Sequence, residues 1–203
     1  SVVAPCEYQK KTLFRYEDFR FALFSRKGGH SPELENENSL KVLGRTLGRI
    51  HAVGSARNFS VRPELCFETE IEDSSSFLLK YYVPDELKNA YGTLIQDLVS
   101  ACRFIFETPY RSASIRIHGD CHVGNILWRN NVAHFVDFDD CLNSPAVQDL
   151  WMFLHGHRID RELQLSKLIE GYSEFYDFDT RQIRLIEVLR TRRIINYAAW
   201  LGK

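Results

Sequence analysis

Two groups of polar side chains that could serve a metal ion and a hydroxyl group follow each other closely in the sequence. The first group contains Asp120 and Asn125, and the second contains Asp137, Asp139 and Asp140. A carboxylate can orient a hydroxyl group or accept its proton. Carboxylate and amide oxygens also suit Mg²⁺, a hard cation that keeps several of its waters. The residue types therefore favour metal-assisted chemistry at a hydroxyl group.

A predicted β-hairpin joins these two groups. Residues 126–128 and 132–136 form two short strands, and residues 129–131 (Arg-Asn-Asn) form the turn, because asparagine tolerates a positive φ. A hairpin returns the chain to its starting point. We therefore expect the two polar groups to lie side by side at the open end of the hairpin.

The spacing of the polar residues matches the catalytic segments of protein kinases. In kinases the Asp of an H-R-D motif accepts the proton of the substrate hydroxyl, while an Asn five positions later and the Asp of a D-F-G motif hold the metal ions. Here Asp120 ends a His-Gly-Asp motif, Asn125 has the required spacing, and residues 137–139 (Asp-Phe-Asp) follow the hairpin. The combination predicts phosphoryl transfer to a hydroxyl group.

A family resemblance rests on the same segments. The sequences HGDCHVGNILW (118–128) and FVDFDD (135–140) resemble the aminoglycoside phosphotransferase and choline kinase superfamily, which has the protein-kinase-like fold. The segments NSPAVQDLWMFL (143–154) and RRIINYAAWL (192–201) are most similar to the bacterial stress response kinase A group, described as Ser/Thr protein kinases. The resemblance is strongest over about residues 115–201.

This resemblance implies a phosphotransferase that uses ATP and Mg²⁺. It assigns Asp120 to the acceptor hydroxyl, Asp137 to catalysis and to the metal, and Asn125 to the metal. Asp139 replaces the Gly of D-F-G and is either a further metal ligand or a partner for the loop backbone, and the sequence leaves both alternatives open. Asp140 is expected to be structural.

The resemblance also implies roles away from these two groups. Ser25 and Lys27 follow a predicted strand at the position of the hinge between the kinase lobes, where the backbone would bind adenine, and the alternative is a plain linker. Asp149 is expected to anchor the backbone of the His-Gly-Asp loop. His51 is expected to be a packing or capping residue.

Composition restricts the class of protein. The 203 residues include 44% hydrophobic and 26% charged residues with a net charge of −1, which is ordinary for a soluble globular protein. Bulk electrostatics therefore favour neither nucleic-acid nor membrane binding. With no apolar run long enough to cross a bilayer and no signal peptide, we expect a cytoplasmic monomer.

The five cysteines are interpreted as reduced thiols, because their number is odd and none forms a C-x-x-C pair. Cys121 and Cys141 flank the proposed metal site, so a redox role for them is the alternative. Zinc binding by His118, Cys121 and His122 is not expected, because their spacing matches no common zinc motif.

Arginines at three neighbouring positions form a basic cluster near the C-terminus. These are Arg190, Arg192 and Arg193. We expect them to form ion pairs or a solvated face. An acidic or phosphorylated partner is the alternative.

The periodicity of the remaining chain predicts an α+β, protein-kinase-like fold with a mostly helical C-lobe. Strands are expected at 12–16 and 16–24, an irregular segment at 55–77, and helices at 35–53, 84–108, 145–154, 159–176 and 180–201. By this reading, residues 1–24 are a remnant of N-lobe strands, 25–34 form a hinge-like loop, and 35–203 form the C-lobe with the catalytic loop at 117–142.

Two kinase elements are missing from the sequence: a Gly-rich loop over the phosphates, and a strand Lys paired with a helix Glu. The chain also begins at Ser1 and ends after an apolar helix. We therefore expect either a fragment of a larger kinase or a natural truncation, and little or no ATP turnover by these 203 residues alone.

Three functions are compatible with these observations. The first is a Ser/Thr protein kinase of the stress-response type. The second is a kinase that phosphorylates a small-molecule hydroxyl on a sugar, an amino alcohol or an antibiotic. The third is a non-catalytic, pseudokinase-like binding module, which the intact set of Asp120, Asn125 and Asp137 argues against.

Overall fold

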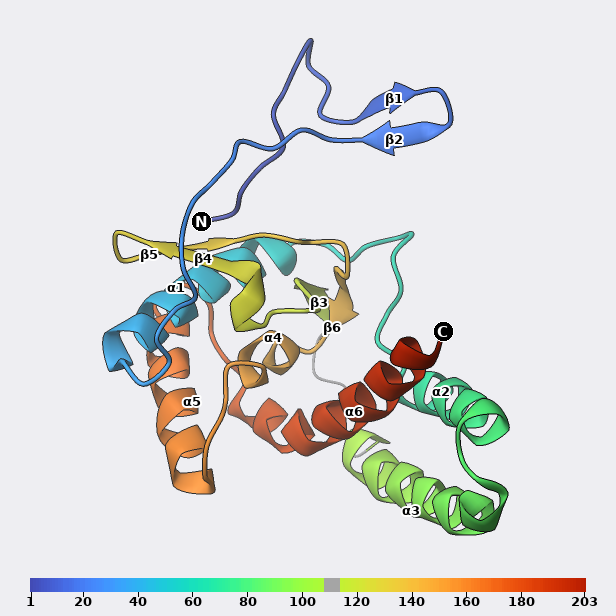
Figure 1. The fold of residues 1–203 in the computed structure, drawn as a ribbon. Helices are drawn as coiled ribbons and strands as arrows, with labels where there is room; N and C mark the ends of the chain where they lie inside the picture. The colour runs from blue at the N-terminus through green and yellow to red at the C-terminus, as the bar shows by residue number, and fades with distance from the viewer. Residues whose placement is uncertain (108–113) are drawn as a thin grey trace.

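The computed structural model describes residues 1–107 and 114–203. Helices dominate this described part of the chain, which also contains three two-stranded sheets (Figure 1). The α+β class predicted from the sequence is therefore confirmed. None of the described helices combines the length and the hydropathy needed to cross a membrane.

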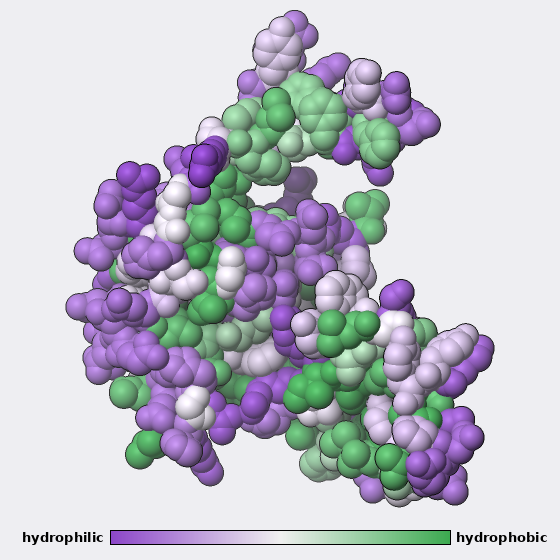
Figure 2. Space-filling view, in the orientation of Figure 1, coloured by the Kyte–Doolittle hydropathy of each residue, from purple (hydrophilic) through white to green (hydrophobic). Residues whose placement is uncertain are grey.

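The N-terminal segment forms a small hairpin of β1 (Phe14–Tyr16) and β2 (Phe19–Phe21), shorter than the predicted strands. Glu17 in its turn has a φ of 50°. The hairpin stands apart from the helical body (Figure 1), and its Phe19 side chain is 72% exposed. In the space-filling view its hydrophobic surface lies mainly on the side toward the body (Figure 2).

The second hairpin is the one predicted between the two polar groups. Strand β4 (Ile126–Arg129) pairs antiparallel with β5 (Val132–Phe135). Asn130 and Asn131 in the turn have φ values of 51° and 57°. Two consecutive left-handed residues match the twist of a two-residue hairpin turn, which asparagine permits at low cost. The predicted hairpin and its turn are confirmed.

A third pair of strands joins the two ends of the catalytic region. Strand β3 (Ile115–Ile117) pairs antiparallel with β6 (Leu142–Ser144), so that Ile117 lies opposite Leu142. The His118 ring then hydrogen-bonds through Nε2 to the Val136 carbonyl at 2.9 Å. These contacts bring the two polar groups side by side, as predicted.

Helices α1 (Glu37–Gly54) and α5 (Arg158–Tyr172) pack against each other on one side of the body (Figure 1). Helix α1 begins where the Asn36 side chain accepts hydrogen bonds from the next backbone N–H groups, a preferred N-cap. Its predicted range is confirmed to within a few residues. The short helix α4 (Val147–Trp151) follows β6 and packs against α5 and α6.

Helix α2 (Phe67–Tyr81) contradicts the prediction of an irregular segment at 55–77. Its buried face contains Ser74 and Ser75 beside Phe67, Ile71 and Leu78. Serines on the buried face weaken the hydrophobic periodicity by which a helix is recognised in the sequence. Three α-helices therefore lie in the described residues before the catalytic region, where two were predicted.

Helix α3 (Lys88–Glu107) follows a single 3₁₀ turn, η1 (Asp85–Leu87), and the predicted end of this helix near residue 108 lies outside the described residues. Its predicted core stripe is only partly right. Cys102 is buried, but Leu87 and Leu94 are each 53% exposed. Helix α3 lies at the edge of the molecule and packs mainly on α2. Its neighbours therefore cover a narrower face of the helix than the one predicted from the sequence.

The C-terminal 3₁₀ segment η3 (Thr180–Leu185) leads into α6 (Ile186–Gly202), where one long helix was predicted. Helix α6 runs between the α1–α5 pair and helices α2 and α3 (Figure 1). It packs chiefly on α2. This contact forms the second side of the body.

Glycines set the close packing of α1 on α5. A Cβ atom at Gly44 would collide with the Leu168 carbonyl oxygen, and one at Gly171 would collide with the Lys41 carbonyl oxygen. In contrast, a Cβ atom at Gly92 on α3 would meet no atom within 4 Å. The two glycines therefore let the helix backbones approach more closely than side chains would allow.

We predict that Gly44→Ala lowers the free energy of unfolding by about 1–3 kcal/mol, because the backbones of α1 and α5 must separate. Gly92→Ala, the matched control, should raise it by about 0.5–1 kcal/mol, because alanine favours the helix and meets no neighbour. Urea denaturation followed by circular dichroism measures both changes. Equal effects of the two substitutions would contradict this account of the packing.

Candidate active site

The buried Asp149 carboxylate holds the backbone of the catalytic loop through two hydrogen bonds. Its Oδ2 accepts the backbone N–H of His118 at 2.8 Å, and its Oδ1 accepts that of Gly119 at 2.9 Å. The Asp149 side chain is 0% exposed. A buried carboxylate is stabilised only by such donors, and the predicted anchoring role of Asp149 is confirmed.

A buried network continues from Asp149 into the α1–α5 pair. His51 Nε2 lies 2.9 Å from Asp149 Oδ2, and His51 Nδ1 lies 2.9 Å from the Tyr172 hydroxyl. Burial raises the pKa of Tyr172 and keeps its hydroxyl protonated. We assign the His51 proton to Nε2, so that the Tyr172 hydroxyl donates to Nδ1. His51 therefore has a structural role, as predicted.

Gly119 permits the close approach of the two polar groups. Its φ is 90°, and a Cβ atom there would collide with the Asp140 carbonyl oxygen and lie 2.6 Å from Leu142 Cδ2. Only glycine adopts this conformation at low cost. Because residue 119 is a glycine, the loop of Asp120 can pack directly against the segment that begins with Asp137.

The Asp120 carboxylate has partners on both of its oxygens. Arg193 Nη1 donates to Oδ1 at 2.7 Å, while Asn125 Nδ2 and His122 Nε2 each lie 3.4 Å from Oδ2. Asn125 Nδ2 also donates to the Asp120 backbone carbonyl at 2.9 Å. The structure thus brings Asp120 and Asn125 together, as their spacing predicts.

Asp137 has a left-handed backbone conformation, with a φ of 62°. Such a conformation is uncommon outside glycine and often marks a functional position. Among the described residues, its side chain has no hydrogen bond or ion pair, and neither does that of Asp139. Both carboxylates are exposed and free to take a ligand.

The oxygen donors of the two polar groups fit a hard cation. Since Asn125 Nδ2 faces Asp120, the oxygen of this amide is left to serve a metal. Within residues 1–107 and 114–203, no three His, Cys, Asp or Glu side chains converge as a metal cluster. A carboxylate and amide set completed by phosphate oxygens and water is typical of Mg²⁺.

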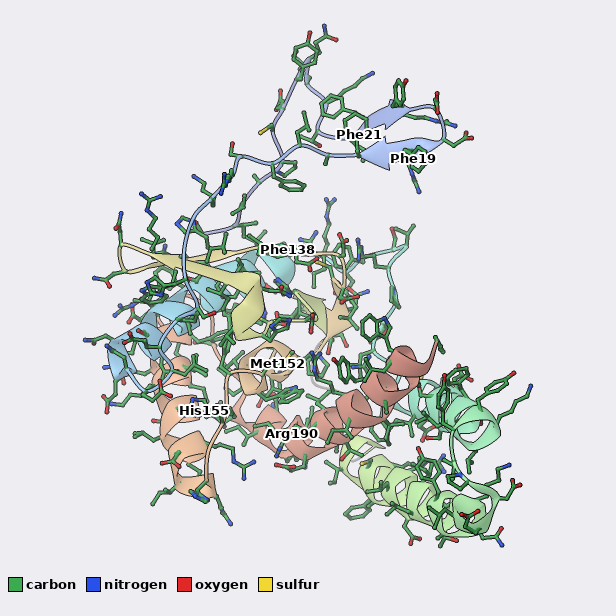
Figure 3. All side chains as sticks on the ribbon, viewed as in Figure 1. Phe19, Phe21, Phe138, Met152, His155 and Arg190 are labelled. Atoms are coloured by element: carbon green, nitrogen blue, oxygen red, sulfur yellow. The ribbon has the colours of Figure 1, made fainter. Side chains whose placement is uncertain are left out.

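Phe138 covers the loop of Asp120 from the side of the N-terminal hairpin. Its ring centroid lies 4.4 Å from that of His118. Figure 3 shows Phe138 at the top of the body, with Phe19 and Phe21 of the hairpin across the open space above it. Aromatic side chains thus lie on both sides of this space.

The hinge-like loop follows β2 and approaches β4. The backbones of His30 and Trp128 exchange hydrogen bonds of 2.7 and 3.1 Å. Ser25 and Lys27 are exposed, and their backbone groups have no backbone hydrogen bond within the described residues. These groups are therefore available to a ligand, which is compatible with the predicted adenine contact.

A pocket of about 1100 Å³ opens beside Asp120. Asp139 and Asp140 line one wall, and Arg193 and Trp200 of α6 line another. Residues of α2 and the segment before it, of the Asp120 loop, and of the stretch from Cys141 to α4 complete the lining. The pocket does not include Ser25, Lys27, Asn125 or Asp137.

The sequence did not reveal how α2 and α6 close this pocket. Glu70 of α2 accepts hydrogen bonds through Oε2 from Arg192 Nε at 2.7 Å and from Asn196 Nδ2 at 3.0 Å. The Cys66 backbone N–H reaches the other Glu70 oxygen at 3.2 Å. The basic cluster was predicted to form ion pairs, and this is confirmed for Arg192 and Arg193 as well as for Arg190, which pairs with Glu187.

All five cysteines are free thiols. Burial raises the pKa of Cys121 well above its usual value. Burial also raises the pKa of Cys141 to about 11. Since the thiolate is the reactive form, neither residue is suited to a redox role at neutral pH.

Comparison with known proteins places these features in a family. The chain matches the phosphotransferase enzyme family over residues 1–186. It is 41% identical over 201 residues to stress response kinase A of Escherichia coli K12, and 40% identical over 201 residues to the serine/threonine protein kinase RdoA of Salmonella typhimurium. These matches cover 98% of this chain but only 60% of each relative.

Solved structures share the fold at low sequence identity. An amicoumacin kinase in complex with AMP-PNP, Ca²⁺ and Ami has a TM-score of 0.75 at 17% identity, over 99% of this chain and 64% of that one. A spectinomycin phosphotransferase in complex with ADP and spectinomycin has a TM-score of 0.71 at 18% identity. The match covers 99% of this chain and 66% of that one. The protein-kinase-like fold predicted from the sequence is confirmed.

We predict that Asp149→Asn lowers the free energy of unfolding by roughly 3 kcal/mol, because the amide nitrogen cannot accept and leaves a buried donor unpaired. Asp97→Asn, at an exposed position on α3, is the matched control and should change it by less than about 0.5 kcal/mol. Urea denaturation measures both. A value for Asp149→Asn close to that of the control would refute the anchoring role.

We also predict that iodoacetamide at pH 7.5 labels the exposed Cys6 and Cys66 well before Cys121 and Cys141. With a pKa of about 11, Cys141 is a thiolate in only roughly one molecule in a few thousand at that pH. Its labelling should accelerate as the pH rises toward the pKa. Peptide mass spectrometry measures each site, and labelling of Cys141 as fast as Cys6 at pH 7.5 would contradict the prediction.

Proposed function

The chain belongs to the phosphotransferase enzyme family, and from this premise we propose that the protein transfers the γ-phosphoryl group of ATP to a hydroxyl group with the help of Mg²⁺. We propose further that the acceptor is a Ser or Thr side chain of a protein. The names of the curated relatives, stress response kinase A and serine/threonine protein kinase RdoA, support the second part.

One observation carries the proposal. The Asp120 carboxylate lines an open pocket, and Asn125, which follows it at the kinase spacing, hydrogen-bonds to its backbone carbonyl. The exposed Asp137 carboxylate belongs to the neighbouring segment. A carboxylate for the acceptor and a separate oxygen set for a metal are the two requirements of phosphoryl transfer on the protein side.

In this proposal Asp120 binds the acceptor hydroxyl and turns its oxygen toward the γ-phosphoryl group. The hydroxyl proton passes to a carboxylate oxygen of Asp120 as the acceptor oxygen bonds to the γ-phosphorus, while the bond from the γ-phosphorus to the β–γ bridging oxygen breaks and ADP leaves. Asp149 contributes by accepting the backbone N–H groups of His118 and Gly119, so that Asp120 starts from a fixed point. The main task of the site is alignment, because phosphoryl transfer leaves little covalent work to the protein.

Asn125 and Asp137 would hold the metal, and Asp139 is the candidate for a further ligand. When bound, Mg²⁺ neutralises charge on the phosphates of ATP. The carboxylates of Asp137 and Asp139 are exposed and have no partner within residues 1–107 and 114–203, which supports this assignment. For the nucleotide, the free backbone groups at Ser25 and Lys27 and the aromatic surface of Phe138 support a place between the hairpin and the body.

A small-molecule acceptor is the second candidate. The pocket volume of about 1100 Å³ is enough for a drug-sized molecule. Its lining includes Tyr197 and Trp200, whose rings stack with centroids 5.7 Å apart. This aromatic surface would suit a ring-containing acceptor as well as a peptide.

The test is phosphotransfer by the full-length protein with labelled ATP and Mg²⁺, offered protein acceptors in one arm and small hydroxyl compounds in the other. Asp120→Asn should lower the transfer rate by about 10²–10⁴-fold, because the group that accepts the proton is lost. It should leave nucleotide binding intact, because Asp120 serves the acceptor.

Asp97→Asn on the outer face of α3 is the control and should transfer at the wild-type rate. The arm in which transfer appears decides between the two acceptor classes. If Asp120→Asn transfers as fast as wild type, the assignment of the acceptor-binding carboxylate is wrong. If the full-length protein binds no Mg²⁺–nucleotide, the protein is a binding module instead.

A further inference from the structure

Arg193 is the closest side-chain partner of the proposed acceptor-binding carboxylate. Its Nη1 lies 2.7 Å from Asp120 Oδ1, a distance at which a charge-assisted hydrogen bond is strong. The contacts on the other oxygen are both longer, at 3.4 Å from Asn125 Nδ2 and from His122 Nε2. Among the described side chains, Arg193 therefore makes the main restraint on the direction of this carboxylate.

The contact leaves room for an acceptor. Arg193 uses one nitrogen on one oxygen, and an ionised carboxylate offers about four positions for donors. An acceptor hydroxyl can therefore bind Asp120 while Arg193 stays in place. The Asp120 and Arg193 side chains are 24% and 37% exposed, and both line the pocket, so the pair faces the space that the acceptor enters.

Helix α6 is fixed around Arg193 by the residues on either side of it. Arg192 and Asn196 both donate to Glu70 Oε2 on α2. These hydrogen bonds, together with the buried contacts between α2 and α6, fix how α6 lies against α2 and therefore where the Arg193 side chain begins. Helix α6 therefore determines both the position of a pocket wall and, through Arg193, the direction of the Asp120 carboxylate.

We propose that Arg193 is a positioning residue for phosphoryl transfer, which aligns the Asp120 carboxylate with the acceptor and makes this alignment depend on the α2–α6 contact. The inference rests on the proposed function of Asp120. It adds a residue that lies far from the catalytic loop in the sequence, with a separation of 73 positions. Arg193 acts through Asp120 and needs no contact with ATP.

The protein offers a closely matched control. Arg190 lies on the same helix (Figure 3), its side chain is 39% exposed, and Nη1 pairs with one carboxylate, Glu187, at 3.0 Å. Arg190→Gln therefore removes the same charge and the same kind of ion pair from α6 without touching the pocket. Any difference between the two substitutions reports the link to Asp120.

The experiment measures steady-state phosphotransfer by the full-length protein. Arg193→Gln should lower kcat about 10- to 100-fold with a smaller change in KM, because a misaligned group costs rate more than binding. Arg193→Lys should recover most of the loss, since the contact uses a single nitrogen. Arg190→Gln should match wild type. Equal kcat values for Arg193→Gln and Arg190→Gln, or a rise in kcat, would overturn the inference.

The coupling to α2 gives a second readout. Glu70→Gln should lower kcat in the same direction, and the double variant Glu70→Gln/Arg193→Gln should be no slower than Arg193→Gln alone, because both act through one contact. Losses that multiply would show that the α2–α6 contact acts separately from Arg193, and would overturn this part of the inference.

A structural readout separates failure of this inference from failure of the proposed function. In a crystal structure of full-length Arg193→Gln, the Asp120 carboxylate should no longer point toward α6. In the structure of Arg190→Gln, the Asp120 carboxylate should still point toward α6. An unchanged Asp120 in Arg193→Gln would overturn the inference whether or not the wild-type protein transfers phosphate. Absence of transfer by wild type would count against the proposed function alone.

Discussion

The buried Asp149 carboxylate is the interaction on which the rest of the site depends. It accepts two backbone N–H groups of the catalytic loop and one ring N–H of His51, and it is fully shielded from water. An ionised group in such a place is stable only with all of its donors. The loop, helix α4 and helix α1 are therefore fixed relative to one another by a single side chain, and Tyr172 extends the link to α5.

The two sides of the body are built differently. On the α1–α5 side, glycines bring the two helix backbones into close contact. On the α2–α6 side, the helices meet through Glu70 and its partners, and the pocket opens between them and the loop of Asp120. The reacting groups therefore stand on the base that Asp149 and the α1–α5 pair hold, while the separate α2–α6 pair supplies a wall of the pocket.

Much of the fold could be predicted because its signals are local. The hairpin of β4 and β5 follows from an Asn-Asn turn, and α1 follows from its hydrophobic spacing. Helix α2 was missed because serines occupy part of its buried face. The core stripe of α3 was overestimated because periodicity tells which residues share a face, but not how much of that face a neighbour covers.

The sequence by itself determined the pairing of Asp120 with Asn125 and the place of Asp137 beside them, because these residues are separated by one loop and one hairpin whose geometry is set locally. Only the tertiary structure decided that Arg193 meets Asp120, and that Glu70 holds Arg192 and Asn196, across separations of 73 to 126 positions. Contacts of that range depend on how α2 and α6 pack. Their packing is decided by the whole buried surface rather than by any motif, so a basic cluster read along one helix could not reveal its partners.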